Sequence, residues 1–185
     1  MRFVVTGEWS RNHLLRLILF FFLIYILLFW ITNWVLYFQK MNLNPASVVS
    51  YYRGDPQAEF GQPPRPLGAL AETSHFHLFA MGVLVMTLTH LILFLPVSVR
   101  LKGSLTLVTF LSALLCEGSS WLVRFVHPGF AWLKVASFLV LQLSLLGLLV
   151  ALLVGVLRPG RNAYAETNGQ RRWAENDIGL NSPSQ

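Results

Sequence analysis

The sequence predicts an all-α integral membrane protein built as a four-helix bundle. Of its 185 residues 55% are hydrophobic and only 12% are charged, about half the charged share of an average soluble domain. Four apolar segments are each long enough for a membrane-spanning helix, which needs roughly 20 residues. We therefore expect a transmembrane domain over residues 1–157, followed by a polar tail at 158–185 that has little to bury and is predicted to be disordered.

The first helix is predicted over residues 14–37, after a short basic segment. This apolar run is much longer than the core of a signal peptide. Trp30, Trp34 and Tyr37 lie at its far end, and such an aromatic group is typical of a membrane–water interface. We therefore interpret the run as an uncleaved membrane-spanning helix.

A long connection at residues 38–73 follows. Asn44 and Pro45 are good residues for a helix N-cap and first turn, so a short interfacial helix is expected over Pro45–Tyr52. The remaining proline-rich part should be extended. Connections of this length are usually functional or disordered.

The other three helices are predicted over residues 74–95, 104–126 and 131–157. Thr73 or Ser74 should cap the first of them, and Pro96 should end it. Small residues recur at four-residue spacing on the last two helices, which favours close helix packing in lipid. These residues are Ser112, Cys116 and Ser120 on one helix and Gly147, Ala151 and Gly155 on the other.

The basic residues predict the orientation of the bundle. Most of the 14 Lys and Arg residues fall on the side that four crossings assign to both termini, so the positive-inside rule makes that side cytoplasmic. The loop at 38–73 is then outside. Because the net charge of +6 lies at helix ends, we expect lipid as the partner and no nucleic acid. The expected location is a bacterial inner membrane, with a multi-pass topology.

Histidines are the first candidate functional residues. His75, His77 and His90 lie in the second predicted helix and His127 ends the third. His75 and His90 should lie about 22 Å apart along the axis, and His127 is expected level with His75 and His77. Imidazoles from facing helices are the axial ligands of haem b, so these four histidines are predicted cofactor ligands. The alternatives are a copper or zinc site at His75 and His77, or no cofactor and local hydrogen bonds only.

Glu117 is the second candidate, some 13 Å below the outer surface by helical rise. A carboxylate at that depth must be paired, protonated or hydrated. A structural ion pair with Arg124 is the favoured interpretation. Proton exchange with a quinol, with His90 or His127 as partner, is the functional alternative.

Several classes of site are excluded. Cys116 is the only cysteine, so disulfides, iron–sulfur clusters and structural zinc sites with several thiolates cannot form within the chain. No G-x-S-x-G elbow and no phosphate-binding glycine loop is present. The chain is therefore not expected to be an enzyme by itself.

Two resemblances add to this interpretation. The run 75–81, with Tyr51-Tyr52-Arg53-Gly54 before it and the segment 120–124 after it, resembles small bacterial inner-membrane proteins without an assigned activity. That resemblance implies four membrane helices and no catalytic residue. The spacing of His75 and His90 resembles that of membrane b-type cytochromes, in which such histidines on one helix hold two haems.

Two functions follow as expectations. One is a b-type haem or quinone-linked electron-transfer subunit, working with other membrane redox subunits, with Glu117 handling protons. The other is a non-catalytic accessory or assembly protein without a cofactor. The sequence leaves the oligomeric state open.

Overall fold

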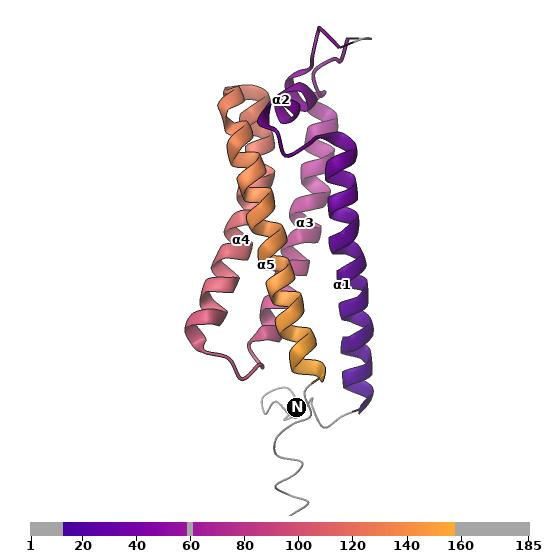
Figure 1. The fold of residues 1–185 in the computed structure, drawn as a ribbon, viewed down its shortest axis with the longest axis vertical. Coiled ribbons are helices and arrows are strands. Elements are labelled where there is room, and N and C mark those ends of the chain that lie inside the picture. The colour runs from indigo at the N-terminus through magenta and orange to yellow at the C-terminus, as the bar shows by residue number, and fades with distance from the viewer. Residues whose placement is uncertain (1–12, 59–60, 158–185) are drawn as a thin grey trace, which may run out of the picture.

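Four long helices form an upright bundle with a short helix across one end (Figure 1). The structure, a computed structural model, describes residues 13–58 and 61–157. Within these residues the regular structure is helical, apart from one isolated bridge between Asp55 and Gln62. The predicted all-α membrane fold is confirmed, because four helices are long and apolar enough to cross a bilayer. The tail predicted to be disordered, 158–185, lies outside the described residues.

Helix α1 spans His13–Lys40. Its exposed side chains are mostly large and apolar along its whole length, as a helix in contact with lipid requires. Leu23, Ile26 and Tyr37 are its buried residues. They therefore mark the narrow stripe by which α1 joins the bundle.

Helix α2 spans Pro45–Arg53 and lies across the top of the bundle in Figure 1. Asn44 caps it by accepting a hydrogen bond from the backbone N–H of Ala46, and Pro45 occupies its first turn, so this predicted start is confirmed. Gly54 ends it with a φ of 85°, a left-handed conformation that glycine adopts without steric cost.

Helix α3 spans Leu67–Ile92 and begins seven residues before the predicted start at 74. The predicted cap at Thr73 or Ser74 is therefore wrong: Pro66 precedes the first turn, and its side chain forms no capping hydrogen bond. Residues 67–73 are mostly apolar or good helix formers, so α3 begins before the apolar core of the membrane span. The helix ends at Ile92, shortly before Pro96, which disfavours helical geometry in the residue that precedes it.

Helix α4 spans Val99–Trp121 and continues as a π-helical turn, η2, over Leu122–Val126. Ser98 caps its start by accepting from the backbone N–H of Leu101. A 3-10 turn, η3, over Pro128–Phe130 leads into α5, which spans Ala131–Leu157. Proline at the start of η3 is the physical reason that α4 cannot run on into α5.

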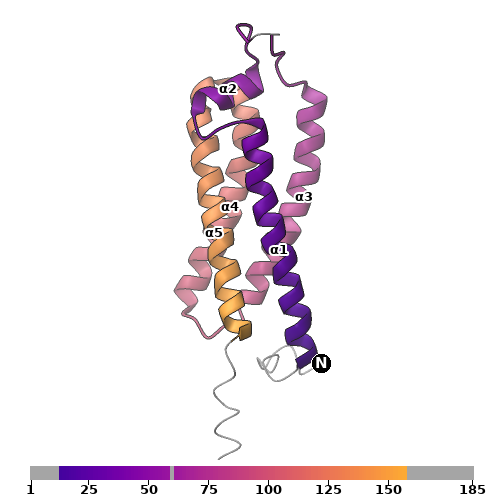
Figure 2. The ribbon, with the colours of Figure 1, turned by 45° about the vertical axis from the view of Figure 1, so that its right-hand side comes forward.

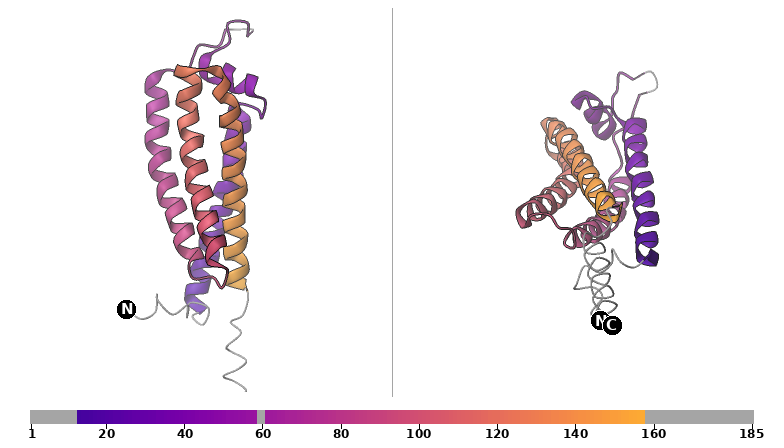
Figure 3. Two further views of the ribbon diagram at one scale, coloured as in Figure 1. Left: turned by 90° about the vertical axis from the view of Figure 1, so that its left-hand side faces the viewer. Right: turned by 60° about the horizontal axis from the view of Figure 1, so that its bottom comes forward.

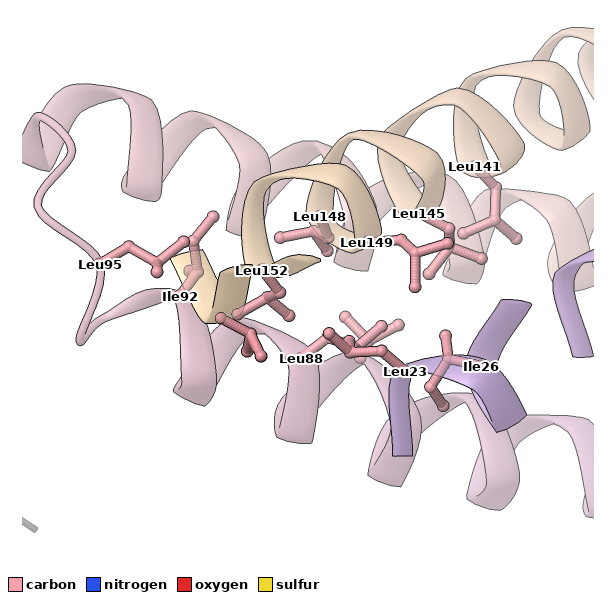
Figure 4. Packing of buried hydrophobic residues seen from close by; sticks show 12 residues of the cluster. Leu23, Ile26, Leu88, Ile92, Leu95, Leu141, Leu145, Leu148, Leu149 and Leu152 are labelled. Atoms are coloured by element: carbon pink, nitrogen blue, oxygen red, sulfur yellow. The ribbon is translucent and has the colours of Figure 1, made fainter. Parts of the chain in front are cut away.

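Helix α5 is the centre of the bundle. It contacts α1, α2, α3 and α4, and its interface with α4 is the most extensive in the fold. Leucines of α5 pack against α1 and α3 in the half of the bundle remote from α2 (Figure 4). Buried members of this cluster include Leu23, Ile26, Leu88, Ile92, Leu145 and Leu148.

The first residues of α1 and the last residues of α5 lie at the same end of the bundle, opposite α2 (Figures 1 and 3). Four antiparallel crossings dictate this arrangement. The polar site described next lies towards the α2 end.

Candidate functional site

A buried lysine ties three helices together near α2. Lys134, in the first turn of α5, is only 7% exposed. Its Nζ donates to the Cys116 carbonyl at 2.7 Å and to Ser120 Oγ at 2.9 Å, and lies 3.5 Å from Cys116 Sγ. Ser120 Oγ also lies 3.0 Å from the Tyr52 hydroxyl of α2, and the Tyr52 ring centroid is 6.0 Å from Nζ. The ammonium group therefore has its hydrogen-bonding capacity filled by the protein.

A carboxylate and an imidazole face each other across α3 and α4. Glu117 Oε2 lies 3.4 Å from His77 Nδ1, and Ser74 donates its hydroxyl to Glu117 Oε1. Trp121 Nε1 in turn donates to Ser74 Oγ at 2.8 Å. The Glu117 side chain is 13% exposed and that of His77 is 60% exposed. The pair thus joins a largely buried carboxylate to an accessible imidazole.

The favoured ion pair between Glu117 and Arg124 is not what the structure shows, so that prediction is wrong. Arg124 Nε donates instead to the backbone carbonyl of Arg65 at 3.0 Å. Arg65 donates to Thr73 Oγ1 at 3.3 Å and stacks on the Tyr51 ring at 5.2 Å. The π-helical turn rotates the segment 122–126 relative to a regular helix, which is why spacing along α4 misplaced Arg124. Burial raises the pKa of the Tyr51 hydroxyl, although Arg65 opposes this shift.

A cavity of about 420 Å³ lies between these groups and α1. All five α-helices contribute to its wall, so it is a feature of the whole α2 half of the bundle. Its polar lining includes Asn33, Arg65, His77, Glu117, Lys134 and Gln142.

Gln142 is the most buried polar side chain on the wall. It is 1% exposed and its Oε1 has no hydrogen-bond partner among the described residues. Its backbone carbonyl accepts from Trp30 Nε1 of α1 at 3.0 Å. A buried polar atom left unpaired costs about 1–3 kcal/mol. Gln142 lines the cavity, but this oxygen has almost no accessible surface, so a polar ligand would bond it only after the amide turns towards the cavity.

The predicted histidine ligands do not meet in one place. His77 lies beside Glu117, whereas His127 is ten residues further along α4 and η2, roughly 15 Å along the axis. His127 Nδ1 accepts from the Gly129 backbone N–H at 3.0 Å, so one ring nitrogen is used for capping η3. The expected equal height of His127 and His77 is therefore wrong, because α3 starts higher and Glu117, not His127, comes level with His77.

His75 and His90 lie on exposed surfaces of α3. His90 contacts Phe94 with ring centroids 5.5 Å apart, and His75 contacts Phe76 at 5.8 Å. No group of three or more His, Cys, Asp or Glu side chains in the described ranges could hold a metal ion. Haem b at the four histidines, and a metal at His75 and His77, both stay predictions. The observed contacts provide no second ligand for either group and do not test whether one binds.

Sequence reasoning missed Lys134 and Gln142. Lys134 is one of the 14 basic residues used only to predict orientation, and the four-residue stripe that contains Cys116 and Ser120 predicted a packing surface. The stripe in fact presents a carbonyl and a hydroxyl to Lys134. The signal that could have found the site is a lysine and a glutamine inside one apolar run, since each needs a partner in lipid.

Residues 42–163 match a protein family described as a transmembrane helical domain. The match includes α2, α3, α4 and α5 and therefore most of the cavity wall. No curated protein and no solved structure matches the chain. The match covers well over half of the sequence, so the chain is an integral membrane protein that belongs to this family of transmembrane helical domains.

Proposed function

We propose that this membrane protein binds the head group of an isoprenoid quinone in the cavity between α1, α3, α4 and α5, as a quinone-linked component of a membrane redox assembly. The observation that carries the proposal is the unpaired Gln142 Oε1 on the wall of a cavity of about 420 Å³. Rotation of this amide towards the cavity would let a ligand bond the buried oxygen and remove the cost of leaving it unpaired.

The chemistry of the wall favours a neutral polar ring over an anionic lipid head. The ammonium group of Lys134 is already bonded to Cys116 and Ser120, so it offers no free donor to a phosphate. Glu117 on the same wall repels an anion, and the other cations of the lining, Lys40 and Arg65, lie at the α2 end of the cavity. Tyr37 and Phe138, whose rings are stacked at 3.9 Å, also line the cavity, and such surfaces accept planar rings.

Glu117 and His77 supply the proton chemistry that a quinone site needs. A carboxylate close to a bound ring can accept a hydrogen bond from a quinol hydroxyl, and an imidazole beside it can take up the proton. The Glu117 to His77 contact of 3.4 Å provides that connection. We assign these two residues to proton handling and Gln142 to orientation of the ring.

Direct binding tests the proposal. The purified protein in lipid nanodiscs is titrated with a quinone that lacks a tail, and quenching of tryptophan fluorescence is followed, because Trp30 is bonded to Gln142. We expect Gln142→Leu to lower the affinity about tenfold, the equivalent of 1.4 kcal/mol. Gln39→Leu is the matched control, since Gln39 is an exposed glutamine of α1. Equal affinities for the wild type and Gln142→Leu, or no saturable quenching at all, would overturn the proposal.

Haem b binding by the histidines is tested separately, by visible absorption spectroscopy. A Soret band that shifts on reduction with dithionite and disappears in His75→Ala or His90→Ala would support a haem-binding electron carrier. A colourless preparation from haem-replete cells would remove that function and leave quinone binding unaffected. If quinone binding also failed, a non-catalytic accessory role would remain.

A further inference from the structure

The cavity is closed towards one end of the bundle and open along one side. In the half remote from α2, Leu23 and Ile26 of α1 pack in one cluster with Val85, Leu88 and leucines of α5 (Figure 4). These contacts seal the floor. Towards α2, α1 is held mainly by α5, and its other flank turns towards α3 (Figure 2).

The rim of the opening is defined by residues that both line the cavity and are exposed. On α1 these are Phe29, which is 36% exposed, Thr32, Leu36, which is 54% exposed, and Lys40. On α3 they are His77, Leu78, which is 49% exposed, Ala80 and Gly82, and α4 adds Leu114. A side chain that belongs to the wall and also meets the outside marks a place where the cavity reaches the surface. The opening therefore lies between α1 and α3.

This opening faces the bilayer. The rim residues lie within helices that are long and apolar enough to span a membrane. Apart from Lys40, at the α2 end of α1, and the ionisable His77, they are uncharged. Acyl chains therefore surround the apolar part of the rim. The polar groups, in contrast, lie inside, at Glu117 and Gln142.

Resting on the quinone-binding function proposed above, we propose that the ligand enters sideways from the lipid between α1 and α3, and that its isoprenoid tail stays in this opening while its ring lies inside. The apolar part of the rim and the polar interior match the two parts of such an amphiphile. Gly82 supports this arrangement because a Cβ added there would meet no atom within 4 Å, so the backbone of α3 leaves free space at the rim.

Photolabelling tests the route. Two tritiated quinone analogues are added to the protein in nanodiscs, one with a diazirine on the ring and one with a diazirine on the first isoprenoid unit. Labelled residues are mapped by mass spectrometry with and without excess unlabelled quinone. We expect the tail probe to label the rim residues of α1 and α3, and the ring probe to label residues around Gln142, both in a way that the excess quinone suppresses.

The two probes separate the two proposals. Suppressible ring labelling with tail labelling at Tyr51 or Arg65, near α2, would overturn the sideways route while keeping quinone binding. Tail labelling of lipid alone would overturn it as well. Absence of suppressible labelling by either probe would overturn quinone binding itself.

A pair of leucines on α1 gives a second measurement. Leu28 and Leu36 are both 54% exposed, but only Leu36 lines the cavity. We expect Leu36→Trp to narrow the opening and slow release of the tailed quinone at least fivefold, with Leu28→Trp releasing it at the wild-type rate. Equal rates in the two variants would contradict a gate at this rim.

Discussion

Lys134 shows how one charged side chain can be accommodated in a bundle that spans a membrane. A lysine at the centre of a membrane helix costs about 2.5–3.5 kcal/mol on insertion scales. Lys134 reduces this cost in three ways: it lies in the first turn of α5, it donates to Cys116 and Ser120, and it lies near the ring of Tyr52. Its charge is thereby used to hold α2 and α4 against α5.

Ser120 should consequently matter more than its neighbour. We expect Ser120→Ala to lower the free energy of unfolding by about 1–3 kcal/mol, because the Tyr52 hydroxyl and the Lys134 ammonium group each lose a buried partner. Ser119→Ala is the matched control: Ser119 is 1% exposed, and its hydroxyl donates to the Cys116 carbonyl of its own helix. Thermal denaturation in detergent provides the comparison, and equal midpoints for the two variants would contradict this role of Ser120.

Residue identities alone predicted which carboxylate was unusual but not what it contacts. Glu117 stood out because a charge inside an apolar run needs a partner. Its actual partners, Ser74 and His77, come from α3, and their register against α4 depends on where α3 begins. The early start of α3 at Leu67 and the π-helical turn at 122–126 are properties of local backbone geometry. Spacing rules that assume regular helices predict neither the early start of α3 nor the π-helical turn.

At the scale of the helices, the four-residue spacing of small residues on α5 predicted close packing. The structure shows that the two glycines of this stripe differ in the space around them. A Cβ at Gly155 would overlap Leu95 Cδ2 of the α3–α4 connection, whereas a Cβ at Gly147 would lie 3.8 Å from Leu105 Cδ2, an ordinary contact. The stripe therefore contains one position, Gly155, where a side chain would clash, and another, Gly147, where alanine can be accommodated.

Alanine substitutions should reveal that difference. We expect Gly155→Ala to destabilise the fold by about 1 kcal/mol, because Leu95 must move out of a packed cluster. Gly147→Ala should be neutral or slightly stabilising, since alanine favours the helix over glycine. Differential thermal denaturation of the two purified variants measures this. If Gly147→Ala lowered the stability as much as Gly155→Ala does, the space around each glycine would not explain the effect of the substitutions.

At the scale of the whole molecule, composition and hydropathy were sufficient for the fold class. Four apolar runs separated by turn-forming residues leave a helical bundle as the available solution, because backbone groups in lipid must be paired within each helix. The cavity could not be predicted in the same way. It exists because α1 packs along α5 and leaves its flank towards α3 uncovered in the α2 half, and this packing depends on contacts between residues far apart in the sequence.

Orientation in the membrane is the remaining prediction at this scale. The ends of α1 and α5 lie at one end of the bundle and α2 at the other, and the basic residues predict that the α2 end is outside. The proposed quinone site and the pair of His77 and Glu117 would then lie in the outer half of the membrane.

Cysteine labelling in intact bacterial cells checks this orientation. Cys116→Ser removes the only native cysteine, and a single cysteine is then placed at Asp55, beyond α2, or at Arg100, in the first turn of α4 at the opposite end. A membrane-impermeant maleimide should modify Asp55→Cys in whole cells and modify Arg100→Cys only after the cells are broken. The reverse pattern would place the α2 end of the bundle, and with it His77, on the cytoplasmic side.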